Sequence, residues 1–214
     1  MKKALLFLFP LLAAAALVLW YYNNSSAPMG SSSADGAGWV MALGRLAGIA
    51  GALGVMGQLL LMSRADWLQP LRGAGLPAWH HRAGLAIPLF LLAHPALVAW
   101  HHALQAENSF LEQYLAMLRW DDVPQAAAGE VLIIAAVLLS LPFIKRRLSY
   151  AAWKWAHLGV YAGLALAIGH QFELGGDLTA EKPYFAWVWR VLLAFTAANA
   201  LWWRLLKPRL GGRP

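Results

Sequence analysis

Six apolar stretches divide the chain, and each is long enough to cross a membrane as a helix. A spanning helix needs roughly 17–25 mainly apolar residues. The stretches cover residues 4–22, 39–62, 78–104, 126–144, 150–172 and 184–206. Because the chain has 214 residues, only short connections remain between them, and a soluble catalytic domain has no room. The sequence therefore predicts an all-α fold, a six-helix transmembrane bundle.

The composition agrees with this class. Hydrophobic residues make up 60% of the chain and charged residues 13%, and the mean hydropathy is +0.53. There is no cysteine. This excludes disulfides, thiolate-held iron–sulfur clusters and haem attached covalently through a C-x-x-C-H motif.

Charge placement predicts the orientation. If six helices alternate, the clustered basic residues fall on one side: Lys2, Lys3, Arg64, Arg72, Arg82, Lys145, Arg146, Arg147, Arg204, Lys207, Arg209 and Arg213. The opposite connections carry most of the acidic residues. By the positive-inside rule, both termini are expected in the cytoplasm, in a multi-pass protein of a bacterial inner membrane. The net charge of +7 then reflects membrane topology, and no nucleic acid is expected as a partner.

The chain divides into three predicted parts: a first transmembrane helix with an outer loop (1–38), a membrane core (39–208) and a cytoplasmic tail (209–214). The first helix also resembles a secretory signal with a cleavage site at Ala27. Its apolar stretch is longer than the apolar region of a typical signal peptide, and Pro28 follows the candidate cleavage site. We therefore expect the helix to be retained. Ser109–Trp120 repeats apolar residues at helical spacing and predicts a helix lying on the outer membrane surface.

Two pairs of histidines lie in two different apolar stretches. His80 and His94 are 14 residues apart in the third, and His157 and His170 are 13 apart in the fifth. At about 1.5 Å per residue, each spacing is roughly 20 Å along a helix. Histidine is costly inside lipid and there usually has a function. We predict two stacked haem sites between the third and fifth helices, an inner one (His80 with His157) and an outer one (His94 with His170).

Helical phase supports this arrangement in part. Fourteen residues bring His94 back to within roughly 40° of His80, whereas thirteen leave His170 about 140° from His157. The fifth helix would therefore need a local distortion or an oblique crossing. His81 is the competing inner ligand, and phase favours His80.

Other polar residues fit other metals less well. Glu130 is the only acidic residue clearly inside a predicted helix, which argues against a di-iron carboxylate site, and histidines split over two depths do not form a closed zinc site. Arg45 and Arg190 each need an anionic partner or lipid headgroup, and haem propionates are the candidates. His101 and His102 are expected at the membrane surface, or else at an acceptor site.

Several motifs resemble one family. They are Arg64-Ala-Asp-Trp67, Trp79-His80-His81-Arg82-Ala-Gly84, Ala93-His94-Pro95, and Trp155-Ala-His157 with His170. Together they resemble the ferric reductase-like transmembrane domain family, which includes the membrane halves of NADPH oxidases and ferric reductases. In the family a histidine commonly lies four residues before the glycine, which here is His80. The family's arginine usually follows its histidine directly, which here favours His81, so the resemblance leaves both as candidate inner ligands.

The resemblance implies a membrane oxidoreductase with two b-type haems. Electrons would enter from cytoplasmic NAD(P)H through FAD, both held by a domain or partner outside this chain, and leave to oxygen or ferric iron. It also places Arg45, as the candidate catalytic residue, near the outer haem, while Arg190 is a candidate haem-binding residue. One alternative is a haem subunit served by a separate flavoprotein or quinol that passes electrons to a periplasmic protein. An alternative of another class is a non-redox proton or metal conduit.

Overall fold

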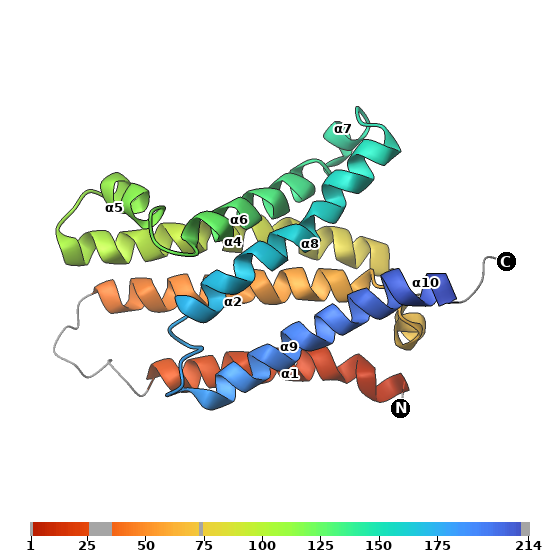
Figure 1. Cartoon of the computed structure of the whole chain (residues 1–214), viewed down its shortest axis with the longest axis horizontal. Coiled ribbons are helices and arrows are strands. Elements are labelled where there is room, and N and C mark those ends of the chain that lie inside the picture. Colours follow the sequence, from red (N-terminus) through yellow and green to blue (C-terminus); the bar gives the residue numbers. More distant parts are fainter. Residues whose placement is uncertain (1, 26–35, 73–74, 211–214) are drawn as a thin grey trace. The chain divides into compact units, whose positions relative to one another are not determined.

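A computed structural model describes residues 2–25, 36–72 and 75–210 (Figure 1). Every regular element in these ranges is a helix, which confirms the predicted all-α class. The possible cleavage site at Ala27, most of the outer loop, and tail residues 211–214 lie outside the described residues.

Long helices coincide with the six apolar stretches. They are α1 (Lys2–Ser25), α2 (Gly36–Leu61), α4 (Leu76–Ala106), α6 (Val123–Leu138), α8 (Tyr150–Glu173) and α9 (Pro183–Ala200). A π-helical turn, η2 (Leu201–Leu206), and α10 (Lys207–Leu210) extend the last one. By length and composition, four helical segments of the described chain can cross a membrane: α1, α2, α4 and Pro183–Leu210. Helix α6 is apolar but has only 16 residues, so six spanning helices stay a prediction.

Proline and serine set several helix ends. The fourth apolar stretch was expected to be helical to residue 144, but α6 ends at Leu138 and a short helix, α7 (Pro142–Lys145), follows. The residue before a proline avoids the helical region, and Leu141 is extended with ψ 137°. Helix α8 then begins where the Ser149 side chain accepts from the Ala152 N–H at 3.2 Å.

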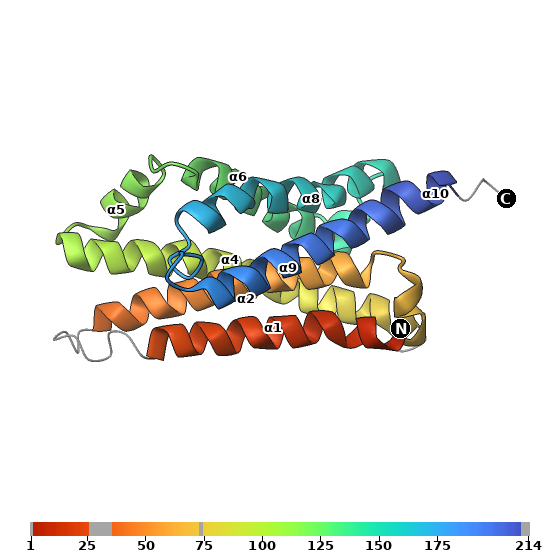
Figure 2. The same cartoon turned by 60° about the horizontal axis from the view of Figure 1, so that its bottom comes forward.

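The predicted surface helix is present as α5 (Phe110–Met117), which follows α4 in Figure 2. Ser109 caps it, and Glu112 completes a capping box by accepting from the Ser109 N–H at 3.1 Å. Phe110, Leu111 and Leu115 are exposed. An exposed apolar face of this kind suits a helix lying on a membrane surface, which remains a prediction.

The chain forms two compact units. The first comprises Met1–Asn23, Leu53–Gly84 and Asp177–Pro214. Its core joins the start of α1, the connection after α2 and the end of the last helix. Buried Leu60, Ala65, Trp67 and Leu68 pack there with Leu5, Leu6, Phe9, Phe195 and Trp203.

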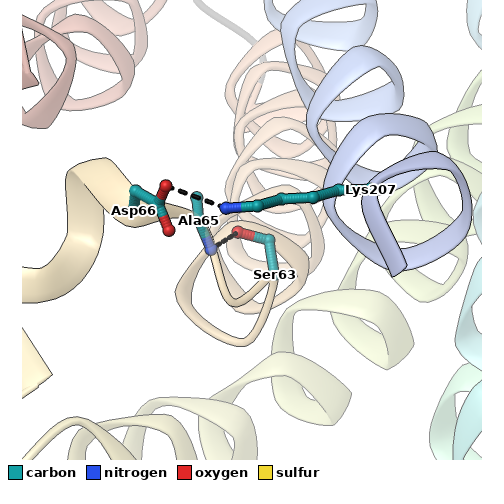
Figure 3. A network of polar contacts seen from close by, with 4 residues as sticks. All are labelled: Ser63, Ala65, Asp66 and Lys207. Carbon is teal, nitrogen blue, oxygen red and sulfur yellow. Dashed lines mark hydrogen bonds and ion pairs between the residues drawn. The ribbon is translucent and has the colours of Figure 1, made fainter. Parts of the chain in front are cut away.

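Polar contacts hold the connection that contains η1 (Asp66–Leu68) and α3 (Gln69–Arg72). The Ala65 N–H donates to the Ser63 hydroxyl at 3.4 Å, and Lys207 Nζ pairs with Asp66 Oδ2 at 2.9 Å (Figure 3). The buried Trp67 indole donates to Asn199 Oδ1 at 2.9 Å. The connection and the last helix are therefore bonded to each other at the end where the sequence predicts cytoplasmic charges.

The second unit comprises Asn24–Ala52 and Leu85–Gly176. Within it α6 and α8 run side by side (Figure 1). A Cβ atom added to Gly129 would lie 2.5 Å from the Gly163 carbonyl oxygen, and one on Gly163 would lie 2.7 Å from the Gly129 oxygen. Small residues at such crossings let the helix backbones touch. This contact fixes α8, which carries two of the predicted histidine ligands.

Candidate haem site

The predicted outer pair of histidines meets inside the second unit. The ring centres of His94, on α4, and His170, on α8, lie 5.9 Å apart, and the ring planes are inclined by 71°. Both side chains are half-buried. Two residues that are 76 positions apart in the sequence therefore face each other from two helices, as their matched depths predict.

The backbone of α2 fixes the His94 ring. His94 Nδ1 lies 2.9 Å from the Gly44 carbonyl oxygen. A carbonyl only accepts, so Nδ1 carries the hydrogen, and in the neutral ring Nε2 keeps the lone pair that a metal needs. Gly48, one turn later, leaves room for the ring, because a Cβ atom there would lie 2.8 Å from His94 Nδ1.

The opposite ring has an unsatisfied nitrogen. His170 Nδ1 is buried and has no hydrogen-bond partner among the described residues. Such a group calls for an explanation, and coordination of a metal ion by the ring would supply one. If both rings bound the same metal ion, each with a metal–nitrogen distance of about 2.0–2.1 Å, the ring centres would lie roughly 6 Å apart. The observed spacing fits two-histidine ligation of haem iron.

In the part of the chain that the structure describes, no larger metal cluster competes with this pair. Within the described ranges, no group of three or more histidine, cysteine, aspartate or glutamate residues gathers in a way that could hold a metal ion. Two protein nitrogens are enough for six-coordinate haem iron, since the porphyrin supplies the other four ligands.

His157 faces a different neighbourhood from His170. Its Nδ1 lies 3.0 Å from Ser140 Oγ, and its ring stacks on Trp153 with centres 5.3 Å apart. Of the two alternatives for the fifth helix, the local distortion is not observed, because α8 is α-helical from Tyr150 to Glu173. A regular helix keeps the two histidines about 140° apart. For His157 to face His80, the two helices must therefore cross obliquely, which is the remaining alternative.

His80 is half-buried in the first unit, whereas the adjacent His81 is exposed. With its amide oriented as its neighbours require, Gln58 faces His80 Nδ1 and donates to the His80 carbonyl oxygen at 3.1 Å. Burial thus favours His80 over His81 as the inner ligand. His80 and His157 belong to different units, and the inner pair stays a prediction.

The arginines are placed separately. The Arg45 guanidinium, on α2, lies against the loop after α8, where a Cβ atom on Gly176 would be 2.6 Å from Arg45 Nη2. Arg190 is exposed on α9 in the other unit. His101 is buried beside His102, with ring centres 5.1 Å apart, and His102 contacts the Trp120 ring. The catalytic role of Arg45 and the haem-binding role of Arg190 remain predictions.

Comparison with known protein families gives a match to the sequence of this chain. The profile described as "Ferric reductase like transmembrane component" matches residues 47–168, more than half of the chain. The chain belongs to the ferric reductase-like transmembrane family. The matched range includes His80, His94 and His157 and ends two residues before His170. No curated protein and no solved structure matches the chain.

Membership makes this chain a membrane component of an oxidoreductase family. It also confirms the resemblance drawn from the histidine motifs.

The structure adds residues that the motifs do not reveal: the Gly44 carbonyl, Gly48, Gln58, Ser140 and Trp153. Their contacts depend on which helices pack together. Among them only Gly44 and Gly48, four residues apart on α2, leave a sequence signal, and this spacing indicates close packing without naming a partner.

Proposed function

We propose that this chain carries electrons across a membrane, from a cytoplasmic NAD(P)H/FAD donor through two b-type haems to an outer acceptor, oxygen or ferric iron. The observation that carries the proposal is the meeting of His94 and His170 at 5.9 Å, with His94 Nε2 left available by the Gly44 carbonyl. Family membership supports the same reading.

The proposal assigns a role to each histidine pair. His94 and His170 would hold the outer haem, and His80 and His157 would hold the inner one. Haem held by histidines would supply one-electron transfer. The apolar helices exclude water, so the ligand rings need hydrogen bonds from the protein to stay in place. Gly44 supplies one of these at 2.9 Å.

The donor side is proposed at the end of the second unit that carries basic residues. Lys145, Arg146 and Arg147 are exposed together after α7 begins. A flavoprotein domain or subunit with an acidic surface would be attracted to them. Lys145 Nζ also lies 3.9 Å from the centre of the Trp153 ring, which in turn stacks on His157. The proposed docking charges are thus two contacts away from a proposed inner ligand.

The acceptor side is proposed near Arg45. Its guanidinium lies in the unit that contains the outer pair, beside the loop that leaves α8. A fixed positive charge attracts a reduced, anionic product or an anionic ferric chelate.

The reduced-minus-oxidised absorption spectrum tests the proposal. Protein purified after expression with ample haem should show low-spin b-type bands from two haems. Full protein yield without these bands would refute the proposal, as would a purified protein that holds another metal instead. A conduit without redox function would give that colourless result.

A further inference from the structure

Ser140 lies at the centre of a small polar network in the second unit. It follows α6 by two residues and is half-buried. Its hydroxyl lies 2.7 Å from the Ala136 carbonyl oxygen, 3.1 Å from Trp153 Nε1 and 3.0 Å from His157 Nδ1. The network therefore links α6 to two side chains that lie one turn apart on α8.

The hydrogen-bond capacity of a hydroxyl determines the direction of each bond. Serine has one hydrogen to donate and two lone pairs to accept with. The Ala136 carbonyl can only accept, so it receives the hydroxyl hydrogen. The Trp153 indole can only donate, so it takes one lone pair. The remaining lone pair must accept, and His157 Nδ1 is therefore the donor.

This assignment fixes the form of the His157 ring. With the hydrogen on Nδ1, the neutral imidazole presents a lone pair on Nε2, the nitrogen that extends away from the backbone. The stacked Trp153 ring, 5.3 Å away and inclined by 19°, limits rotation about the side-chain bonds.

We infer that Ser140 is a positioning residue for the inner haem: it holds His157 in the Nε2-ligating form and raises the electron-donating strength of the ring. The inference rests on the proposed function, because it takes His157 as a ligand. Hydrogen bonds to the outer nitrogen of a ligating histidine set its orientation and raise its basicity. A more basic ligand stabilises ferric over ferrous iron, so the Ser140 bond lowers the midpoint potential of the inner haem.

The test is a redox titration of the full-length protein with both haems, comparing Ser140→Ala with Ser140→Thr and Ser149→Ala. The inner component is the one that disappears in His157→Ala. Alanine removes the acceptor and threonine keeps it. Ser149 caps the same helix but does not touch His157, so Ser149→Ala controls for a general effect on α8.

For Ser140→Ala we expect a higher inner midpoint potential. A tenfold change in the preference for ferric iron corresponds to about 59 mV for one electron. The outer haem of Ser140→Ala should keep its wild-type potential. Both haems should keep their wild-type potentials in Ser140→Thr and in Ser149→Ala. Loss of the inner haem from Ser140→Ala alone would also support the inference, since removing such a partner typically weakens metal binding about 10–100-fold.

Three results would overturn the inference. One is an unchanged inner potential in Ser140→Ala, and another is an equal shift in Ser149→Ala. If Ser140→Ala does not fold, Ser140→Cys keeps the size with a weaker acceptor, and an unchanged potential there would overturn it too. A wild-type protein without haem would refute the proposed function itself. If the wild-type protein holds both haems and the inner midpoint potential does not change in Ser140→Ala, only the role of Ser140 is refuted.

Discussion

Gly48 leaves the space that the His94 ring occupies. Alanine normally favours a helix interior by roughly 0.5–1 kcal/mol over glycine. At this position, however, the added Cβ would lie 2.8 Å from His94 Nδ1, so the ring must move away from the Gly44 carbonyl. We expect Gly48→Ala to weaken outer haem binding about 10–100-fold, measured as haem content after purification.

Gly38→Ala is the matched control for this change. Gly38 lies on the same helix, and a Cβ atom there would have no neighbour within 4 Å. It should keep both haems. Normal outer haem content in Gly48→Ala would show that the ring tolerates displacement.

The two outer histidines should behave as one site. Because the rings of His94 and His170 face each other, His94→Ala and His170→Ala should each remove the same spectral component. The double variant should lose no more than that component. Reduced-minus-oxidised spectra check this, and two different missing components would separate the histidines into two sites.

At this scale the sequence predicts which histidines meet better than it predicts the contacts around them. The matched spacings of 14 and 13 residues put His94 and His170 at the same depth, and the structure brings this pair together. The bonds to Gly44 and Ser140 involve a backbone oxygen and a common surface residue type. Neither has a recognisable motif, because any residue has a carbonyl and only helix packing decides which one faces the ring.

Among the elements, the connection after α2 is held by a buried hydrogen bond. Trp67 is 6% exposed and donates from Nε1 to Asn199 Oδ1 at 2.9 Å. Trp67→Phe removes the donor and leaves that oxygen buried, which should destabilise the protein by about 1–3 kcal/mol. Thermal unfolding in detergent measures the change.

Trp155→Phe makes the same chemical change where the ring is 72% exposed, so the melting temperature should hardly move. Equal losses in both variants would mean that the Trp67 bond contributes little.

The cap of α5 should depend on pH. Hydrogen bonds from the Ser109 hydroxyl and backbone lower the pKa of Glu112 below its ordinary value. The carboxylate therefore stabilises the folded cap above the ordinary pKa, and this contribution is lost as pH falls through the lowered one. In a ¹³C NMR titration, Ser109→Ala should raise the pKa of Glu112 toward the ordinary glutamate range. If the pKa of Glu112 does not change in Ser109→Ala, the hydrogen bond from Ser109 does not lower it.

The existence of the long helices is predictable from apolar runs, but their ends and local form are less so. The sequence places a helix over residues 126–144, where Leu141 before Pro142 adopts an extended conformation instead. It also leaves a distorted fifth helix open as an alternative to an oblique crossing, and α8 is α-helical over its whole length. Gly163 admits the backbone of α6 at Gly129, a requirement that only the packed pair reveals.

For the whole molecule, we expect redox activity without nucleotide oxidation. In the proposed function, FAD and NAD(P)H are held by a domain or partner outside this chain. The 214-residue chain should therefore not oxidise NAD(P)H by itself, although dithionite should reduce its haems. Adding a cytoplasmic flavoprotein reductase should restore NAD(P)H-driven reduction.

Stopped-flow mixing with air-saturated buffer then identifies the acceptor. Rapid reoxidation would support oxygen, and haems that stay reduced for minutes would point to a protein or quinone.

Reversing the charges of Lys145, Arg146 and Arg147 should slow flavoprotein-driven reduction, most clearly at low salt. Rapid NAD(P)H oxidation by the chain alone would contradict the assignment of the flavin to a separate domain.

The order of synthesis gives the outer pair a consequence during assembly. His94 follows its supporting Gly44 by 50 residues, but His170 follows His94 by 76. At about 5–20 residues per second, the ribosome needs roughly 4–15 s to make that second interval. During it the nascent chain already has the helix and carbonyl that orient His94, and lacks the opposing ring. If His94 and His170 together hold the outer haem, its capture must therefore come late in biogenesis, and a chain truncated before α8 should emerge without it.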